Sequence, residues 1–299
     1  MTTADASPPT EAAPAVSGPP PLSNLHLRSA AASSRAALAA LLLRDLAVLR
    51  KHLVEFVLRT LIQPFLLVFV FLYVFPKIGQ AVGGGGGSAA FATVLVPGVV
   101  GISVMFQGVQ SVALTLAQEF GFTREIEDRV QAPCPVWLVA VSKVLFGVVQ
   151  GVLAAAIVFP IAAVIHAGGV HPVFDVRWWV VVTLLPLTRL AFSALGLVLG
   201  CVFEPRNIGL MFGFIVLPIT FLGGTYYQWT RLRPVQVGGF PWLQTLVLVN
   251  PLIYVNEGLR AAFTSIPHMH LYVIYPVLVG FCALFLTIGI RAFRSRVLT

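Results

Sequence analysis

Charged side chains are scarce in this sequence. Only 10% of the 299 residues are Asp, Glu, Lys or Arg, whereas 58% are hydrophobic. A soluble domain carries roughly 25% charged residues. The composition therefore excludes an ordinary soluble globular protein and indicates a chain that lies mostly within a membrane.

Cysteine is also rare, and a nucleotide-binding motif is missing. Cys134, Cys201 and Cys282 are scattered without metal-ligand spacing, and their odd number argues against a full disulfide framework. No Gly-x-x-x-x-Gly-Lys-Ser/Thr motif occurs, and the glycines at 83–87 are not followed by one either. We therefore expect no cofactor in this chain, no metal site and no ATP site of that type.

Long apolar runs make up most of the chain. A membrane-crossing helix needs about 20 apolar residues to cross a core of about 30 Å, and about six stretches are this long. The sequence therefore predicts an all-α polytopic membrane protein. The expected spans lie near residues 56–76, 90–118, 137–166, 178–203, 206–224 and 271–291.

The distribution of Lys and Arg predicts the topology. The net charge of +8 fits the cytoplasmic excess of a membrane protein and does not require nucleic acid as a partner. The positive-inside rule places both termini and residues 119–136 in the cytoplasm, and the glycine loop and residues 225–270 outside. We expect a multi-pass protein of the cytoplasmic (inner) membrane. The residues counted inside are Arg28, Arg35, Arg44, Arg50, Lys51, Arg59, Arg124, Arg129, Lys143, Arg206, Arg291, Arg294 and Arg296, and those outside are Lys77, Arg177, Arg231, Arg233 and Arg260.

The N-terminal region changes character before the first span. Residues 1–23 are rich in Pro, Ala, Ser and Thr, which is typical of a disordered tail and not of a signal peptide. Residues 24–57 are expected to form an amphipathic connecting helix at the cytoplasmic interface, the alternative being a helix packed on protein. Residues 58–299 then form the membrane domain. The apolar face of the helix carries Leu38, Leu42, Leu46, Leu49 and Leu53, and the polar face carries Arg44, Lys51 and Glu55.

One compact charged segment, 119–136, separates two apolar runs and ends in Pro133 and Pro135. Phe122, Ile126 and Val130 recur at four-residue spacing, so a helix here has one apolar face. Such a helix is suited to contact a cytoplasmic partner, and the alternative is a solvated helix that contacts nothing. The residues that we assign to this contact are Phe122, Thr123, Arg124, Glu125, Ile126, Glu127, Asp128 and Arg129.

Residues 225–270 are too irregular for a span. The apolar run Leu243–Val249 is shorter than a span requires, which favours a re-entrant or interfacial position, and Tyr and Trp favour the headgroup region. We predict two short helices that dip into the outer leaflet and return. The residues assigned to this outer region are Tyr226, Tyr227, Trp229, Trp242, Asn250, Pro251, Glu257 and Arg260.

Three elements of residues 30–295 occur in a specific order around these spans. The charged helix is followed by Gln131-Ala132-Pro133-Cys134-Pro135, and the fifth span ends in the small-residue turn Phe221–Tyr227. A third run contains Trp242-Leu243, Asn250-Pro251-Leu252, Tyr254 and Glu257-Gly258-Leu259-Arg260. In these elements the chain resembles the permeases of ATP-binding-cassette exporters with the ABC-2-type membrane domain. It is closer to their drug-resistance and nodulation-factor branch than to the O-antigen branch.

The resemblance implies a permease of six spans that is paired with a second permease subunit, identical or paralogous. It also implies two separate ATPase subunits, which bind ATP and Mg, and it makes 119–136 the coupling helix on which they dock. The chain itself is then not an enzyme. It moves an amphipathic substrate, such as a drug, a glycolipid or a lipid-linked polysaccharide, among membrane lipids, and the sequence does not choose between these.

Arg189 departs from the family pattern because it lies deep in the fourth span. A central charge costs roughly 2.5–3.5 kcal/mol on insertion scales and usually faces the bundle interior or a wet cavity. No acidic residue of the sequence lies at a matching depth. Arg189 is expected to bond backbone carbonyls freed near Pro186, Pro160 or Pro218, to attract an anionic substrate, or to extend toward the interface.

Other polar and small residues of the spans are candidates for packing or for the substrate path. Gln107 and Gln110 either join helices or line the path, because the resemblance places the second and fifth spans at the subunit interface. Small-xxx-small pairs predict close packing within the chain, with the last pair as the candidate contact between subunits. The candidate path residues are Phe106, Gln107, Gln110, Arg189 and Phe214, and the pairs are Gly147/Gly151, Gly196/Gly200 and Gly209/Gly213.

Two other functions compete with export. An integral membrane transferase acting on lipid-linked substrates usually carries carboxylate or His clusters for metal or base chemistry, whereas the cytoplasmic acids here occur in the coupling-like segment without His. A secondary transporter needs coupling-ion carboxylates and usually inverted repeats, and the sequence shows neither. The transferase is kept as the alternative function.

Overall fold

The computed structural model describes residues 30–74, 77, 87–123, 135–164 and 175–298. In this part of the chain every regular element is a helix, and an isolated bridge between Val237 and Phe240 is the one β pairing. The predicted all-α class is therefore confirmed for the described residues. The α-helices are α1 (Ala30–Lys51), α2 (Leu53–Val68), α4 (Gly87–Gln118), α6 (Val136–Val164), α7 (Trp178–Val202), α8 (Ile208–Met211), α9 (Leu217–Leu222), α10 (Trp242–Leu246), α11 (Pro251–Phe263) and α12 (Leu271–Leu298).

Short π- and 3-10-helical turns extend several of these helices. The π turns continue α2 over Phe69–Val74, continue α4 over Glu119–Thr123, and join α8 to α9 over Phe212–Val216. The 3-10 turns are Pro205–Asn207, Trp229–Leu232 and Val247–Val249.

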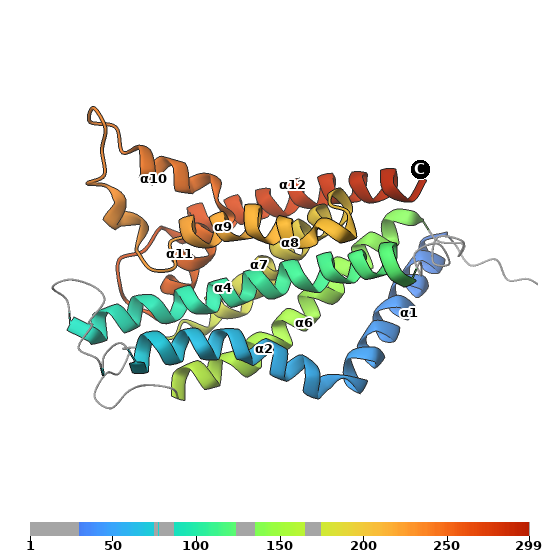
Figure 1. Cartoon of the computed structure of the whole chain (residues 1–299), viewed down its shortest axis with the longest axis horizontal. Helices are drawn as coiled ribbons and strands as arrows, with labels where there is room; N and C mark the ends of the chain where they lie inside the picture. The colour runs from blue at the N-terminus through green and yellow to red at the C-terminus, as the bar shows by residue number, and fades with distance from the viewer. Residues whose placement is uncertain (1–29, 75–76, 78–86, 124–134, 165–174, 299) are drawn as a thin grey trace, which may run out of the picture.

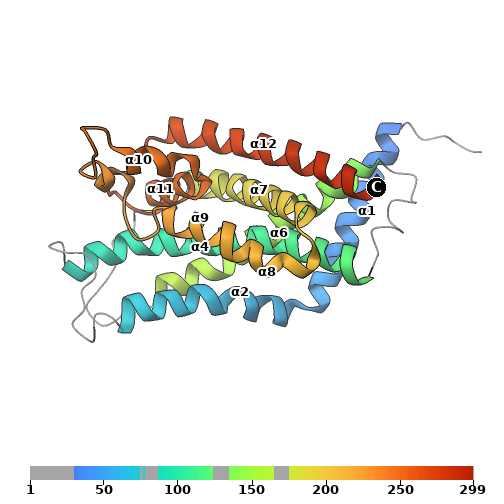
Figure 2. The same cartoon turned by 45° about the horizontal axis from the view of Figure 1, so that its top comes forward.

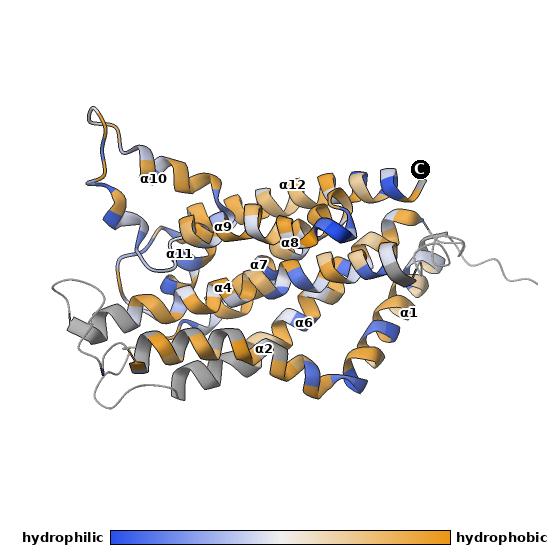
Figure 3. Cartoon of the chain, in the orientation of Figure 1, coloured by the Kyte–Doolittle hydropathy of each residue, from blue (hydrophilic) through white to orange (hydrophobic). Residues whose placement is uncertain are grey.

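Five helical segments of the described residues are long and apolar enough to cross a membrane. They are Thr93–Gly121, Val136–Ala156, Trp178–Val202, Pro205–Leu222 and Leu271–Val297, and they coincide with the predicted second to sixth spans. The first predicted span, 56–76, lies on α2 and its π turn and is not among the five. Figure 3 shows hydrophobic residues along the long helices and hydrophilic residues mainly at the bundle ends.

The long helices run side by side in one bundle (Figures 1 and 2). Helices α4 and α7 pack together at its centre, and α12 and α6 pack against α7. The described start of α1 and the end of α12 lie at one end of the bundle, while α10 and α11 lie at the other. Figure 1 shows α4 between α2 on one side and α8 and α9 on the other.

Small residues explain the close approach of the central helices. A Cβ on Gly196 would overlap the backbone of Val109, and one on Gly147 would overlap Ser193. A Cβ on Gly200 would crowd the backbone of Ala113, and one on Gly151 would overlap Arg189. The prediction that these two pairs serve packing within the chain is confirmed.

One amphipathic helix is predicted over 24–57, and this is wrong for the described residues from Ala30 onward. Helix α1 ends at Lys51, His52 departs from helical geometry with φ −109° and ψ 27°, and α2 begins at Leu53. In both views α1 lies across the end of the bundle, whereas α2 runs along it. The predicted leucine face is not buried as a unit: Leu49 of α1 is buried, whereas Leu46 of α1 and Leu53 of α2 are exposed.

Candidate functional site: a polar cleft beside Arg189

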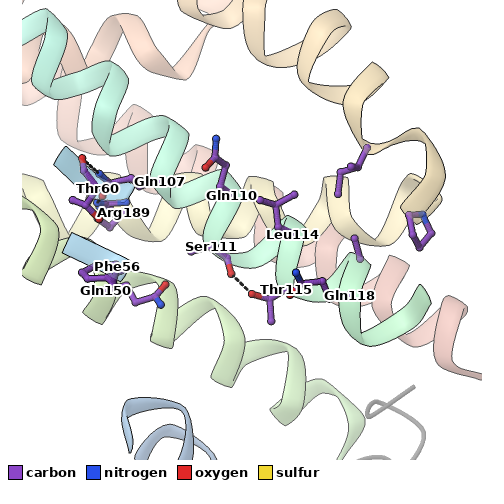
Figure 4. Close-up of a pocket in the computed structure, with 13 residues that line it drawn as sticks. Phe56, Thr60, Gln107, Gln110, Ser111, Leu114, Thr115, Gln118, Gln150 and Arg189 are labelled. Atoms are coloured by element: carbon purple, nitrogen blue, oxygen red, sulfur yellow. Dashed lines mark hydrogen bonds between the residues drawn. The ribbon is translucent and has the colours of Figure 1, made fainter. Parts of the chain in front are cut away.

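A cavity of about 420 Å³ enters the bundle between α2, α4, α6 and α8. Its lining is unusually polar for a bundle interior, because amides, hydroxyls and one arginine face it (Figure 4). Arg189, Gln107 and Thr60 lie together toward one end of the view, and Thr115 and Gln118 toward the other. The complete lining is Phe56, Thr60, Gln107, Gln110, Ser111, Leu114, Thr115, Ala117, Gln118, Gln150, Arg189, Pro205 and Ile208.

Arg189 of α7 reaches sideways into two neighbouring helices. Its side chain is 1% exposed, and it donates to the carbonyl oxygens of Val104 at 3.0 Å and Gly151 at 3.3 Å. It also donates to the Gln107 side-chain oxygen at 2.6 Å. Arg189 thus bonds helix carbonyls as predicted, but not carbonyls that a proline frees. The absence of a side chain on Gly151 is what leaves room for the guanidinium beside α6.

Gln107 connects this arginine to α2. Its side-chain amide donates to the backbone carbonyl of Thr60 at 3.2 Å while its oxygen accepts from Arg189. Pro64 has no amide hydrogen to donate to Thr60, four residues earlier in the same helix. Gln107 therefore satisfies a carbonyl that the α2 backbone leaves available, and one side chain ties α2, α4 and α7 together.

A second cavity of about 530 Å³ continues the first toward α1. The two share the lining residues Phe56, Ser111, Thr115, Gln118 and Gln150, so they form one cleft. Hereafter the part beside Arg189 is called the inner cavity and the part beside α1 the outer cavity. The remaining residues of the outer cavity are Arg44, Asp45, Val48, Leu49, His52, Glu55, Glu119, Lys143 and Phe146.

A buried lysine joins three helices at the outer cavity. The Lys143 ammonium of α6 lies 2.5 Å from the Glu119 carboxylate, at the end of α4, and 3.7 Å from the Asp45 carboxylate of α1. Sequence reasoning used Lys143 only for topology and did not consider Asp45, because nothing local connects positions so far apart. The arrangement fixes α1 to the end of the bundle where the segment 124–134 begins.

Comparison with known proteins identifies the family. The ABC-2 type transporter family profile matches residues 36–264. The inner membrane transport permease YadH of Escherichia coli K12 is 32% identical over 233 residues, which cover 76% of this chain and 84% of the relative. YadH of Shigella flexneri matches to the same extent. This chain belongs to the ABC-2 type transporter family. It is a permease subunit of an ABC transporter, and membership of the family implies an ATPase partner.

The permease brings together only part of the predicted substrate path. Gln107, Gln110 and Arg189 line the inner cavity, whereas Phe106 packs against the main apolar core. Phe214 is 78% exposed on the outside of the π turn between α8 and α9. Sequence reasoning missed the cavity residues Thr60, Thr115, Gln118 and Gln150. A signal for part of this set existed, because Gln107, Ser111, Thr115 and Gln118 recur at helical spacing along one face of α4.

The predicted coupling residues lie almost entirely outside the described part of the permease. Residues 124–134 are outside it, and Phe122 and Thr123 are described only as the end of a π turn. No side-chain geometry therefore bears on the coupling residues.

At the end of the bundle away from α1, a buried ion pair joins parts of the region 225–270. Glu257 and Arg260 of α11 are fully buried and lie 2.9 Å apart. Glu257 accepts hydrogen bonds from the amides of Trp229 and Met269, and Arg260 donates to the carbonyls of Gly224–Thr225. Burial lowers the pKa of the Arg260 guanidinium, and the Glu257 charge opposes this shift.

Most of the predicted outer-region residues belong to this assembly. Asn250 caps α11 by accepting from the amide of Leu252, and it donates to the carbonyl of Ile219 at the end of the fifth span. Pro251 begins α11 and is buried, Tyr226 and Tyr227 are half-buried, and Trp242 is exposed on α10. All of α11 is buried among its neighbours, so the described part of this region is a packed cap and not a loose loop.

Proposed function

We propose that this permease is the membrane subunit of an ATP-driven exporter that moves an amphipathic substrate out of the cytoplasm or the inner leaflet. The observation that carries the proposal is the cleft that extends from α1 to Arg189 inside the bundle. A polar path inside an apolar bundle suits a solute with a polar head, because lipid tails offer such a head no hydrogen bonds. Gln107, Gln110 and Arg189 are assigned to this path.

The proposed topology has six spans and both termini in the cytoplasm. Leu53–Val74 is helical throughout, and its part from residue 58 onward, which lies within the predicted span 56–76, is assigned to the first span. Residues 1–23 are assigned as a cytoplasmic tail, 24–57 as the connecting region and 58–299 as the membrane domain. The excess of Lys and Arg at the α1 end supports this orientation, and the similarity to the inner membrane transport permease YadH supports the inner membrane.

The end of the bundle at which α1 lies is assigned as the docking site of separate ATPase subunits. The sequence contains no nucleotide-binding motif of the Gly-Lys-Ser/Thr type, so ATP and Mg are assigned to the partner. Residues 119–136 are assigned as the coupling helix. The contact of Lys143 with Glu119 and Asp45 supports this role, because it links the start of that segment to α1 and α6.

The fifth span is assigned as the contact with a second permease subunit. The backbone at Gly209 and Gly213 faces open space, and Leu210, Phe214 and Phe221 are exposed beside it. Such a face permits close approach of another helix in a membrane. At the opposite end from α1, α10 and α11 are assigned as the outer region that reaches into the outer leaflet.

Reconstitution with the partner tests this function. Liposomes containing the permease and a cassette ATPase receive a trace of NBD-labelled lipids with anionic and with neutral head groups, and dithionite reports their transfer between leaflets. We expect ATP-dependent transfer of at least one probe when both subunits are present. Transfer that does not depend on the ATPase, or chemical modification of the lipids in place of transfer, would contradict the proposal. An ATPase carrying a substituted catalytic carboxylate is the control.

A further inference from the structure

Among the described residues, the inner cavity is lined by one fully charged side chain. These lining residues include no Asp, Glu, Lys or His, and Arg189 is the single ionisable one among them. The other polar groups are four side-chain amides and three hydroxyls, contributed by Gln107, Gln110, Gln118, Gln150, Thr60, Ser111 and Thr115. The inner cavity therefore combines a positive charge with neutral hydrogen-bonding groups.

The positive charge of Arg189 has no counter-charge within the described residues. Its three hydrogen bonds end on two backbone carbonyls and one amide oxygen, and no carboxylate forms an ion pair with it in this part of the chain. A guanidinium has five N–H donors, and the Nε of Arg189 is buried with no acceptor among the described residues. A buried charge is expensive unless it is paired, so an anion in this cavity is favoured.

The surroundings of the inner cavity are suited to an apolar tail. Phe56, Leu114 and Ile208 contribute apolar surface to its lining. Beyond it, Leu58 and Ile62 of α2 and Leu210 of α8 are exposed on the outside of the bundle. A ligand whose head lies beside Arg189 has apolar surface next to it on both sides of α4, because α2 and α8 lie on opposite sides of α4 in Figure 1.

The outer cavity does not favour an anionic ligand over a cationic one in the way that the inner cavity does. Its lining carries Arg44 and Lys143 together with Asp45, Glu55 and Glu119, so positive and negative charges nearly balance there. Lys143 is already paired with two of these carboxylates. Selection by charge is therefore concentrated at Arg189.

We propose that the inner cavity binds the anionic head group of an amphipathic ligand, with Arg189 as the charge partner and the surrounding amides and hydroxyls as hydrogen-bonding groups. This inference rests on the proposed function and names the substrate class of the same cleft. The chemistry fits a phosphate or carboxylate head on an apolar tail. It does not fit a cationic amphiphile, because Arg189 repels it.

Binding of three probes to the purified full-length permease in phosphatidylcholine nanodiscs tests the inference without the ATPase. Dodecyl phosphate has the anionic head and the tail, dodecylphosphocholine has the tail with no net charge, and inorganic phosphate has the anionic head alone. Calorimetry is expected to give the tightest binding for dodecyl phosphate. Arg189→Gln should weaken it about tenfold or more, because a hydrogen bond between charged groups contributes at least that factor. Arg189→Lys should lose less of the affinity for dodecyl phosphate, because lysine keeps the positive charge.

A second variant covers the case in which Arg189→Gln does not fold. Gln150→Glu places a negative charge in the cleft with almost no change of shape, and it should weaken binding of dodecyl phosphate much more than binding of dodecylphosphocholine. Gln236→Glu, at an exposed position outside the cleft, is the matched control and should change neither.

Each outcome decides the inference. Equal affinity of the two dodecyl probes, or dodecyl phosphate binding that neither variant weakens, would overturn it. Phosphate that binds as tightly as dodecyl phosphate would overturn the amphipathic ligand in favour of a free anion. ATP-driven transfer of neutral lipids alone would leave the proposed function standing and overturn this inference, so the two failures are distinguishable.

Discussion

Gln107 accepts a hydrogen bond from Arg189 at 2.6 Å, and this contact joins the two central helices of the bundle at the polar cleft. Gln107→Leu should destabilise the fold by about 1–3 kcal/mol, because it leaves a buried charged donor without its acceptor. Gln107→Glu should be more stable than Gln107→Leu, since it supplies a carboxylate at the same place. Thermal unfolding of the detergent-solubilised protein measures both. Equal stability of the Leu and Glu variants would show that the contact is unimportant.

Gly151 offers a test of the space around Arg189. A Cβ at this position would overlap the Arg189 side chain, so Gly151→Ala should cost about 1–3 kcal/mol of stability through overpacking. Gly280 of α12 is the matched control, because a Cβ there meets open space. Gly280→Ala should keep or raise stability by up to about 1 kcal/mol, through helix propensity alone. Equal changes of the unfolding temperature in the two variants would show that overlap with Arg189 does not determine the effect of Gly151→Ala.

The sequence predicted the broad architecture because the length of the apolar runs dominates it. A run of about 20 apolar residues can bury its backbone in lipid only as a helix, so the runs at 90–118, 178–203 and 271–291 became helices. The turn at His52 was missed for the opposite reason. No Pro or Gly marks it, and the leucine spacing continues through it, so the bend is decided by tertiary packing against α6.

The sequence predicted only part of the candidate site, because it does not show which helices are neighbours. Arg189 and Gln107 stood out because polar side chains are rare in spans, but their contact depends on α4 and α7 being neighbours. The acceptor on Gly151 was hidden, because a backbone carbonyl leaves no signature in the sequence. The pairing of Lys143 with Asp45 likewise connects helices whose proximity no local pattern indicates.

The fifth span provides a prediction about assembly. Gly213→Leu has room within the chain, so the folded subunit should keep its stability. If the span faces a second permease subunit, the new side chain should block close approach and lower the dimer fraction. Mass photometry in nanodiscs measures that fraction. Gly280→Leu, at a second open position on α12, is the control, and an unchanged dimer fraction in Gly213→Leu would exclude this face as the interface.

The buried pair in α11 provides a prediction about stability. Glu257→Gln removes the charge partner of Arg260 and weakens the acceptor for the amides of Trp229 and Met269. Breaking such a buried pair costs about 3–5 kcal/mol, so we expect a large drop in the unfolding temperature. The exposed pair of His52 and Glu55 is the comparison, and Glu55→Gln should leave stability unchanged. Similar effects of the two substitutions would contradict the structural role of α11.

The coupling segment carries the prediction that bears on the energy source. Glu125→Lys and Glu127→Lys reverse charges of the segment assigned to ATPase docking, and each should weaken co-purification of the ATPase subunit. Loss of one partner of a buried charged pair at an interface typically costs about 2–5 kcal/mol, which is enough to abolish a moderate affinity.

Phe122→Ala should leave assembly intact and uncouple ATP hydrolysis from transport, because it removes apolar contact without changing charge. Asp175→Lys is the matched control, since Asp175 is an exposed acid before α7 whose amide bonds to Phe263 of α11, at the opposite end of the bundle. The bundle should fold in every variant, because positions 122, 125 and 127 fall between the candidate spans Thr93–Gly121 and Val136–Ala156 in the sequence. Co-purification and substrate-stimulated ATPase activity in proteoliposomes measure the two effects. If assembly and stimulation match the unsubstituted protein in all three variants, residues 119–136 are not the coupling helix, and the ATPase must contact this permease elsewhere.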